Sequence, residues 1–264
     1  SSDLGNTWDA GSTANWLDGG SPSVFNNSDN VTFNATGAAN SPVNLSGTLA
    51  PGSVTVDTSG GNYTFAGSGT IVGPVTLTKT GGGTLTIQNA NTYSGGTLVN
   101  GGTVLLGSEN AAGVGDLTLA SDGTLDLNTF SDLVGGLNGS GTVDSVAGGS
   151  PVLTIGNNDA DGTFSGTIQN TTGTVALTKT GNGLDTLSGS NSYAGPTIIN
   201  AGTLRAANAS ALGSNSDVTI SAGILDLASD VAVGSVSGSG VIANNSSAAP
   251  VTLTVQGAAA TTFS

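Results

Sequence analysis

The sequence predicts an all-β protein: a single-stranded parallel β-helix, or β-solenoid, behind an N-terminal capping segment. Two periodicities predict this fold. The stretch that begins LTKTGGGTLTIQNANTYSGG at Leu77 occurs again as LTKTGNGLDTLSGSNSYAGP at Leu177. A shorter period of about 20 residues, the length of one solenoid coil, lies inside this long repeat. Internal repetition of this kind constrains the architecture more strongly than any other feature of a sequence.

The long repeat divides the chain into segments. Lys79 matches Lys179 at an offset of 100 residues, and Phe65, Phe164 and Phe263 mark successive starts of one unit at spacings of 99. We therefore expect four segments, with an N-terminal capping segment over residues 1–64, a first five-coil repeat over 65–163, a second over 164–262, and the start of a third at 263–264.

The short period is marked by glycine, threonine and an apolar or aromatic residue in succession. In the first repeat the steps between successive glycines of this motif are 19, 21, 18 and 21 residues, for Gly83, Gly102, Gly123, Gly141 and Gly162. Such steps fit coils made of short strands and tight corners. Glycine and asparagine fill the intervening stretches, and both tolerate the positive φ that sharp corners need.

The expected strands alternate with a period of two. Leu85 and Ile87 point one way, and the threonines beside them point the other. This alternation indicates a strand with one buried face. We therefore expect Leu85→Asp to cost several kcal/mol, because it places an unpaired charge in a narrow core. Thr86→Asp should cost little, since Thr86 is expected to face solvent.

Both tryptophans lie in the N-terminal segment, which does not match the repeat. An open solenoid end exposes core side chains and unpaired strand edges, and large aromatic side chains can cover it. We expect Trp8 and Trp16 to cap the first coil in this way. A carbohydrate-binding platform on the same tryptophans is the functional alternative.

The other end of the sequence copies the start of a repeat, and no second capping segment follows the last coil. If the chain stops there, its last coil leaves an apolar end and unpaired strand edges. We then expect head-to-tail self-association, in which another subunit covers the residues Val251, Leu253, Val255 and Phe263.

Composition excludes several classes of partner. The net charge is −14, from 17 acidic and 3 basic residues. Nucleic acid and anionic membranes need a basic face, so neither is expected to bind. Cysteine is absent, which removes disulfides and thiolate metal sites. No apolar run approaches the roughly 20 residues that span a bilayer, so we expect no membrane insertion by this chain.

Catalysis is poorly supported, and we expect neither catalytic nor cofactor-binding residues. Histidine and cysteine are absent, which removes the commonest general base and a major nucleophile. Lys79 and Lys179 occupy equivalent repeat positions and are interpreted as solvated turn lysines, too far apart to share one site. Asp126 and Asp226 are repeat equivalents as well, and solvated aspartates are the default interpretation.

One weak metal motif remains. Oxygen-bearing residues at alternate positions followed by glycine suit calcium, and Asn157, Asp159 and Asp161 precede Gly162 in this way. The full spacing of an EF-hand loop is missing, and the second repeat carries GAAA at the corresponding place. Calcium is the one cofactor that the sequence suggests.

The pattern LTKTGGGTLTIQNANTYSGGTLVNGGTVLL resembles the autotransporter-associated β-strand repeat of secreted bacterial passenger domains. The resemblance covers nearly the whole chain. It implies a right-handed solenoid, exported and held outside a Gram-negative-type bacterium or on its outer surface. The stretch Leu184–Leu187 departs from the usual GTLTL run, so we expect a locally irregular coil there.

These observations predict a non-catalytic structural or interaction protein of the bacterial surface. Two mechanisms remain open: a filament subunit that self-associates head to tail, and an adhesin-type stalk that meets a host or cell-surface ligand. A carbohydrate-binding or polysaccharide-degrading β-helix protein is the alternative.

Overall fold

The structure is a computed structural model that describes residues 6–213, 215–245 and 249–257. It is all-β, and its parallel sheets form β-solenoid turns, about 11 across the described residues. The chain divides into two compact units, residues 1–126 and 127–264. This division falls inside the first repeat expected from the sequence. The four-segment scheme is a description of sequence periodicity and stays a prediction.

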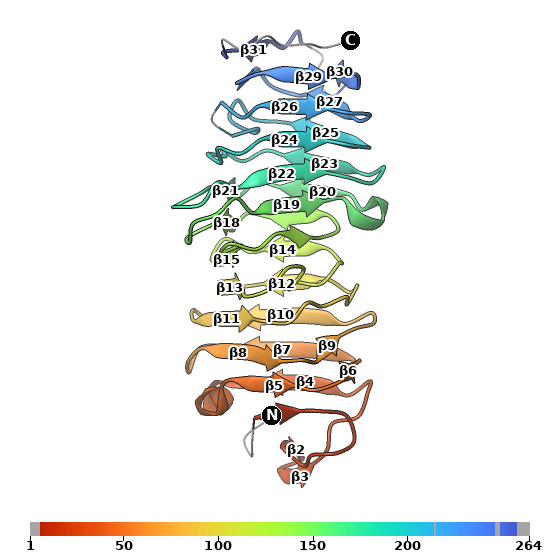
Figure 1. Ribbon diagram of the computed structural model, residues 1–264, viewed down its shortest axis with the longest axis vertical. Helices are drawn as coiled ribbons and strands as arrows, with labels where there is room; N and C mark the ends of the chain where they lie inside the picture. The colour runs from red at the N-terminus through yellow and green to blue at the C-terminus, as the bar shows by residue number, and fades with distance from the viewer. Residues whose placement is uncertain (1–5, 214, 246–248, 258–264) are drawn as a thin grey trace. The chain divides into compact units, whose positions relative to one another are not determined.

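The first unit consists of short strands and one 3-10 helix (Figure 1). In chain order its elements are β1 Thr7–Trp8, β2 Trp16–Asp18, β3 Ser21–Ser23, β4 Asn30–Phe33, η1 Ala35–Asn40, β5 Val43–Leu45, β6 Thr48–Leu49, β7 Ser53–Asp57, β8 Tyr63–Gly67, β9 Thr70–Ile71, β10 Thr76–Thr80, β11 Thr84–Ile87, β12 Thr97–Val99, β13 Gly102–Leu106, β14 Leu117–Leu119 and β15 Gly123–Asp126.

The second unit is built in the same way. Its elements are β16 Asp132–Leu133, β17 Leu137–Gly139, β18 Thr142–Asp144, β19 Val152–Ile155, η2 Asn157–Asp159, β20 Gly162–Phe164, β21 Thr167–Ile168, β22 Ala176–Lys179, β23 Leu184–Leu187, β24 Thr197–Ile199, β25 Thr203–Ala206, β26 Val218–Ile220, β27 Ile224–Leu227, β28 Val231–Val233, β29 Val236–Gly238, β30 Val241–Ala243 and β31 Leu253–Val255.

Each unit stacks its strands into parallel sheets, one strand per coil. In the first unit one sheet runs β1-β5-β8-β11-β13-β15, a second runs β4-β7-β10-β12-β14, and β6 pairs with β9 on a third face. In the second unit the sheets run β16-β19-β22-β24-β26-β29 and β17-β20-β23-β25-β27-β30, with the further pairs β18-β21 and β28-β31. The hairpin β2-β3 is antiparallel.

Strand register confirms the predicted coil length. Leu77 of β10 pairs with Thr97 of β12, which lies 20 residues on. Leu85 of β11 pairs with Val104 of β13, 19 residues on. One coil therefore takes about 20 residues, as the glycine steps predict.

Alternating burial builds the core. Along β11 the side chains of Leu85 and Ile87 are fully buried, and Thr86 between them is partly exposed. The same pattern recurs in β7, β12 and β14. Each buried Leu or Ile contributes about 1.5–3 kcal/mol through removal of apolar surface from water. A narrow core is thus filled by one inward residue in two, as the sequence predicts.

Aromatic side chains of the N-terminal segment form a cluster within the first unit. The ring centroid of Trp8 lies 5.6 Å from that of Trp16 and 5.3 Å from that of Phe33. Trp8 is completely buried, and Trp16 is 6% exposed. This cluster also contacts Phe65 of β8, so the segment that precedes the repeat is packed onto its first coils. Capping as a role stays a prediction.

Two expectations about polar residues are wrong. Lys79 and Lys179 are not solvated, because both side chains are completely buried. Asp126 and Asp226 are buried as well, and Asp226 Oδ2 lies 2.7 Å from Arg205 Nε.

The coil around Leu184–Leu187 is regular, since β23 pairs with β25 over four residues just as β11 pairs with β13. A buried charge here occupies an ordinary strand position and does not distort the backbone pairing.

Among the described residues, no helix is long and apolar enough to cross a membrane.

Candidate functional site

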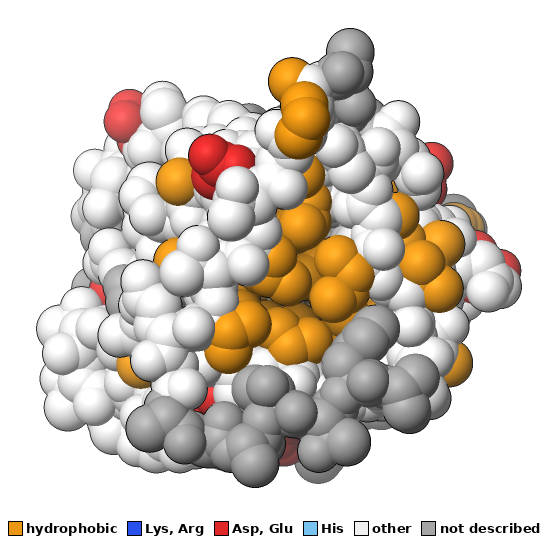
Figure 2. All heavy atoms as spheres, turned by 90° about the horizontal axis from the view of Figure 1, so that it is seen from above, with side chains coloured by type: hydrophobic (Ala, Val, Ile, Leu, Met, Phe, Trp, Pro, Cys, Tyr) orange, Lys and Arg blue, Asp and Glu red, His pale blue; other side chains and the backbone are white. Residues whose placement is uncertain are grey.

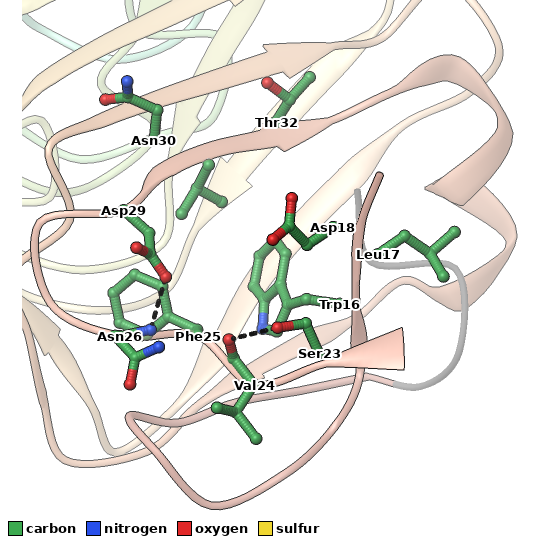
Figure 3. Close-up of a pocket in the computed structure, with 11 residues that line it drawn as sticks. Trp16, Leu17, Asp18, Ser23, Val24, Phe25, Asn26, Asp29, Asn30 and Thr32 are labelled. Carbon is green, nitrogen blue, oxygen red and sulfur yellow. Dashed lines mark hydrogen bonds between the residues drawn. The ribbon is translucent and has the colours of Figure 1, made fainter. Parts of the chain in front are cut away.

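A pocket of about 340 Å³ opens beside the aromatic cluster of the first unit (Figure 3). Its lining comes from the hairpin β2-β3, the loop after it, and β4. The lining residues are Trp16, Leu17, Asp18, Ser23, Val24, Phe25, Asn26, Asp29, Asn30, Val31 and Thr32.

Local sequence shapes this pocket. Gly19 and Gly20 have φ values of 56° and 87°, and they allow the tight turn between β2 and β3. The loop that follows is closed on itself, because Asp29 Oδ2 accepts a hydrogen bond from Asn26 N at 2.8 Å. The pocket wall is thus held by short-range contacts.

The pocket has an apolar base and a polar rim. Trp16, Phe25 and Val31 are buried, whereas Asp18 and Asp29 are exposed. Trp16 Nε1 is buried and finds no hydrogen-bond acceptor among the described residues. A donor beside carboxylates and amides suits a small hydroxyl-rich ligand. Trp8 is shielded, so it offers no open platform.

The two repeat lysines form a second kind of site, inside the coil corners. Lys79 Nζ donates to the carbonyl oxygens of Thr80, Gly81 and Gly101 at 3.2, 2.8 and 2.7 Å. Three acceptors match the three N–H groups of an ammonium. Burial lowers the pKa of Lys79 to about 8, and the charge of Asp57 opposes that shift.

Lys179 makes a related but different set of contacts. Its Nζ donates to the carbonyl oxygens of Thr180 and, at 3.0 Å, Gly181. In place of a third carbonyl it faces Asp185, whose Oδ2 lies 3.7 Å away. Burial lowers the pKa of Lys179, while the charge of Asp185 raises it. Burial raises the pKa of Asp185 to about 6 despite the opposing charge of Lys179.

Sequence reasoning missed these lysine sites, although a signal existed. Lys79 lies two residues after Leu77, on the inward face of a strand that otherwise alternates with threonine. The inward phase of the pattern therefore included the lysine. Lysine is almost never fully buried unless it is paired, and this general tendency outweighed the pattern.

In each repeat an asparagine links neighbouring coils, and a tyrosine bonds to a threonine of its own coil. Asn91 Oδ1 accepts from Ile71 N, and its Nδ2 donates to Ala111 O, both at 2.9 Å. The Tyr93 hydroxyl lies 2.7 Å from Thr97 Oγ1. Equivalent bonds recur in the second repeat, at Asn191 and Tyr193. Bonding between coils thus explains the repeated asparagine, and the bond to a threonine four residues on explains the repeated tyrosine.

Two residues of the calcium motif, Asp159 and Asp161, accept hydrogen bonds from the next coil. Asp159 Oδ1 accepts from the backbone N–H of Asn182 at 2.7 Å, which lowers the pKa of Asp159. Asp161 Oδ1 accepts from Leu184 N at 2.6 Å. Asn157 begins the 3-10 turn η2. No cluster of three or more Asp, Glu, His or Cys side chains suited to a metal occurs in the part of the chain that the structure describes. Calcium stays an untested prediction.

Apolar side chains gather on the face formed by the last described strands of the second unit (Figure 2). Val241 and Val255 are 52% and 42% exposed. Val251 and Leu253 are partly exposed, and Phe263 lies outside the described residues. Of the residues assigned to assembly from the sequence, Leu253 and Val255 belong to β31, the last described strand.

Comparison with known proteins adds to this geometry. The sequence model of the passenger-associated transport repeat matches residues 77–106 and 177–206, which contain both lysine corners. Over 158 residues the chain is 40% identical to the adhesin BmaC autotransporter of Brucella suis biovar 1 (strain 1330), covering 58% of this chain and 4% of that protein.

A second relative is the uncharacterized protein YuaQ of Escherichia coli (strain K12). The chain is 39% identical to it over 90 residues, which cover 33% of this chain and 6% of that protein. The chain thus aligns with only a small part of each of these relatives. No solved structure matches it significantly. The repeat match, the similarity to an autotransporter and the solenoid fold agree: the chain carries two copies of the passenger-associated transport repeat and is similar to part of an autotransporter.

Proposed function

We propose that this chain is a segment of a surface-exposed or secreted passenger, and that it acts there as a non-catalytic rod of adhesin type. The observation that carries the proposal is the pair of passenger repeats, each folded as complete solenoid coils. The relative named as an adhesin supports the same role. A rod of stacked coils can hold a binding surface away from a membrane.

Surface display is tested with antibodies raised against the purified chain. Bacteria that express the full natural protein should be labelled without permeabilisation, and brief protease treatment of intact cells should remove the label. Labelling that requires permeabilised cells would contradict the proposal. A cytoplasmic marker protein that stays protected provides the control.

The polysaccharide-degrading alternative has its own test. The purified chain should release no reducing or unsaturated ends from bacterial, plant or host polysaccharides, because its inward-facing acids and lysines are buried and hydrogen-bonded. Release that disappears in a single Asp→Asn variant would reverse the non-catalytic assignment.

Carbohydrate binding at the N-terminal pocket is a second candidate, favoured by the buried Trp16 Nε1 that has no acceptor. On a glycan array, the wild-type chain should bind selected glycans. Trp16→Phe keeps an aromatic ring but removes the donor, and Asp18→Asn keeps the shape but removes the charge; each should weaken binding. Asp122→Asn, outside the pocket, is the matched control.

Head-to-tail association of subunits is a third part of the proposal, and the exposed apolar side chains of Val241 and Val255 support it. Sedimentation velocity at increasing concentration should show association of the wild-type chain. Val255→Asp should weaken it without a change in circular dichroism. A strictly monomeric wild-type chain would leave the single-rod adhesin in place and remove the filament.

A further inference from the structure

Lys179 and Asp185 form an enclosed pair that the passenger function does not use. They come from consecutive strands, β22 and β23, on either side of the corner at Gly181. Their side chains are 0% and 1% exposed, and Nζ lies 3.7 Å from Oδ2. Asp185 Oδ1 accepts a long hydrogen bond of 3.4 Å from Leu137 N, and Oδ2 accepts none.

We propose that Lys179 and Asp185 join in an intramolecular amide cross-link between Nζ and the side-chain carboxyl carbon of Asp185. The neutral amine attacks this carbon, a C–N bond forms, and the C–O bond to the carboxyl hydroxyl breaks. That hydroxyl leaves with one amine proton as a water molecule. No oxidant, reductant or other co-reactant is needed.

The hydrogen bonds of Nζ suit this reaction. A neutral amine has two N–H groups and one lone pair, and the carbonyl oxygens of Thr180 and Gly181 occupy two donors. The remaining direction faces Asp185. Burial also shifts the pKa of Lys179 downward and that of Asp185 upward, to about 6 for the acid, which favours the two neutral reacting groups.

Close packing holds the two groups together. A Cβ added at Gly162 would lie 2.2 Å from Asp185 Oδ1, and one added at Gly156 would lie 2.8 Å from Lys179 Nζ. Glycine at both positions leaves space for the pair and for little else. Reactants fixed at short range gain a large effective concentration, and enclosure keeps out the water that would hydrolyse the product.

The first repeat provides an internal control for the same chemistry. Lys79 is equally buried, but Leu85 stands where the second repeat has Asp185. Its Nζ satisfies three carbonyl oxygens and faces no carboxylate there. A cross-link is therefore expected at one repeat lysine and not at the other.

Trypsin tests the proposal directly, because it cleaves after free lysine and arginine but not after a lysine whose amine is acylated. The chain has three such sites, Lys79, Lys179 and Arg205. The purified wild-type chain is unfolded in denaturant, diluted and digested. We expect cleavage after Lys79 and Arg205 but not after Lys179. One peptide should span residues 80–205 at a mass lower than its sequence mass by one water.

Asp185→Leu copies the residue of the first repeat and should restore cleavage after Lys179 at the full sequence mass. A succinimide at an aspartate also removes one water, but it leaves Lys179 open to trypsin. Complete cleavage after Lys179 in the wild-type chain, with or without water loss, would overturn the proposal and leave a buried ion pair. This readout in the wild-type chain does not depend on how the variant folds.

Discussion

The two lysine corners share one backbone and differ in what faces the lysine. β10-β11 and β22-β23 carry equivalent residues at an offset of 100, and each buries its lysine fully. In the first, Lys79 is satisfied by three carbonyl oxygens. In the second, a carboxylate takes the place of the third carbonyl. The same corner thus holds a leucine in the first repeat and an aspartate in the second.

The neighbouring coil adjusts to this difference. Leu85 pairs in register with Tyr63, whereas Asp185 pairs with Gly162. The small residue gives the carboxylate room that the aromatic side chain would fill. The difference between the two repeats therefore involves three positions. They are the lysine, the variable residue (Leu85 or Asp185) and the residue that pairs with it one coil earlier.

Replacement of the lysine should give the largest difference in stability loss between the two corners. Lys179→Met leaves Asp185 buried without its partner, and loss of one partner of a buried charged group costs about 3–5 kcal/mol. Lys79→Met leaves carbonyl oxygens without a donor, which costs about 1–3 kcal/mol. Urea unfolding at neutral pH measures both. Equal losses would show that Asp185 does not depend on Lys179.

Exchange of the variable residue should have smaller effects. Leu85→Asp sets a carboxylate near Lys79, so it should cost less than Lys179→Met, in contrast to the severe loss that the sequence alone predicts. It should cost more than Asp185→Leu, because Tyr63 stands where the second repeat has Gly162. The two melting temperatures give the order, and the reverse order would contradict this explanation.

The contribution of the first corner, at Lys79, to the free energy of unfolding should depend on pH. Burial lowers the pKa of Lys79 to about 8, whereas the unfolded chain has the ordinary value of 10.5. Between these values the unfolded chain binds more protons, so the contribution of Lys79 to stability rises with pH. The stability difference between wild type and Lys79→Met should grow from pH 8 to pH 10. A constant difference would show that Lys79 keeps its proton in the fold.

The smallest effect on stability is expected from a substitution on the outward face of β11. Thr86 is partly exposed between the buried Leu85 and Ile87. Thr86→Asp should shift the free energy of unfolding by about 0.5 kcal/mol or less, as surface substitutions usually do. A loss as large as that of Leu85→Asp would mean that the faces of β11 are assigned wrongly.

Periodic features of the sequence predicted most of the fold. Glycine steps gave the coil length, and the alternation at Leu85 and Ile87 gave the buried face. The burial of polar side chains at repeat positions was harder to predict. Lys79 and Asp226 were assigned to solvent because charged residues are rarely buried. In the fold, Lys79 donates to Gly101 on the next coil, and Asp226 accepts from Arg205 on the coil before it.

The candidate sites were less predictable still. The tryptophans were located correctly in the N-terminal segment, yet the pocket beside Trp16 depends on the hairpin turn and on loop closure by Asp29. The Lys179–Asp185 pair follows from sequence alone only if the inward phase of both strands is trusted over residue type. The turn of the chain at Gly181 between β22 and β23 brings the two side chains together, and the spacing of the residues does not specify that turn.

A double-mutant cycle on Lys179 and Asp185 tests most directly whether the lysine makes the buried aspartate tolerable. The free energies of unfolding of wild type, Lys179→Met, Asp185→Leu and the double variant are measured in urea. We predict that Asp185→Leu, added to Lys179→Met, recovers a large part of the lost stability, because no buried carboxylate is left without a partner. Additive losses from the two substitutions would contradict the account.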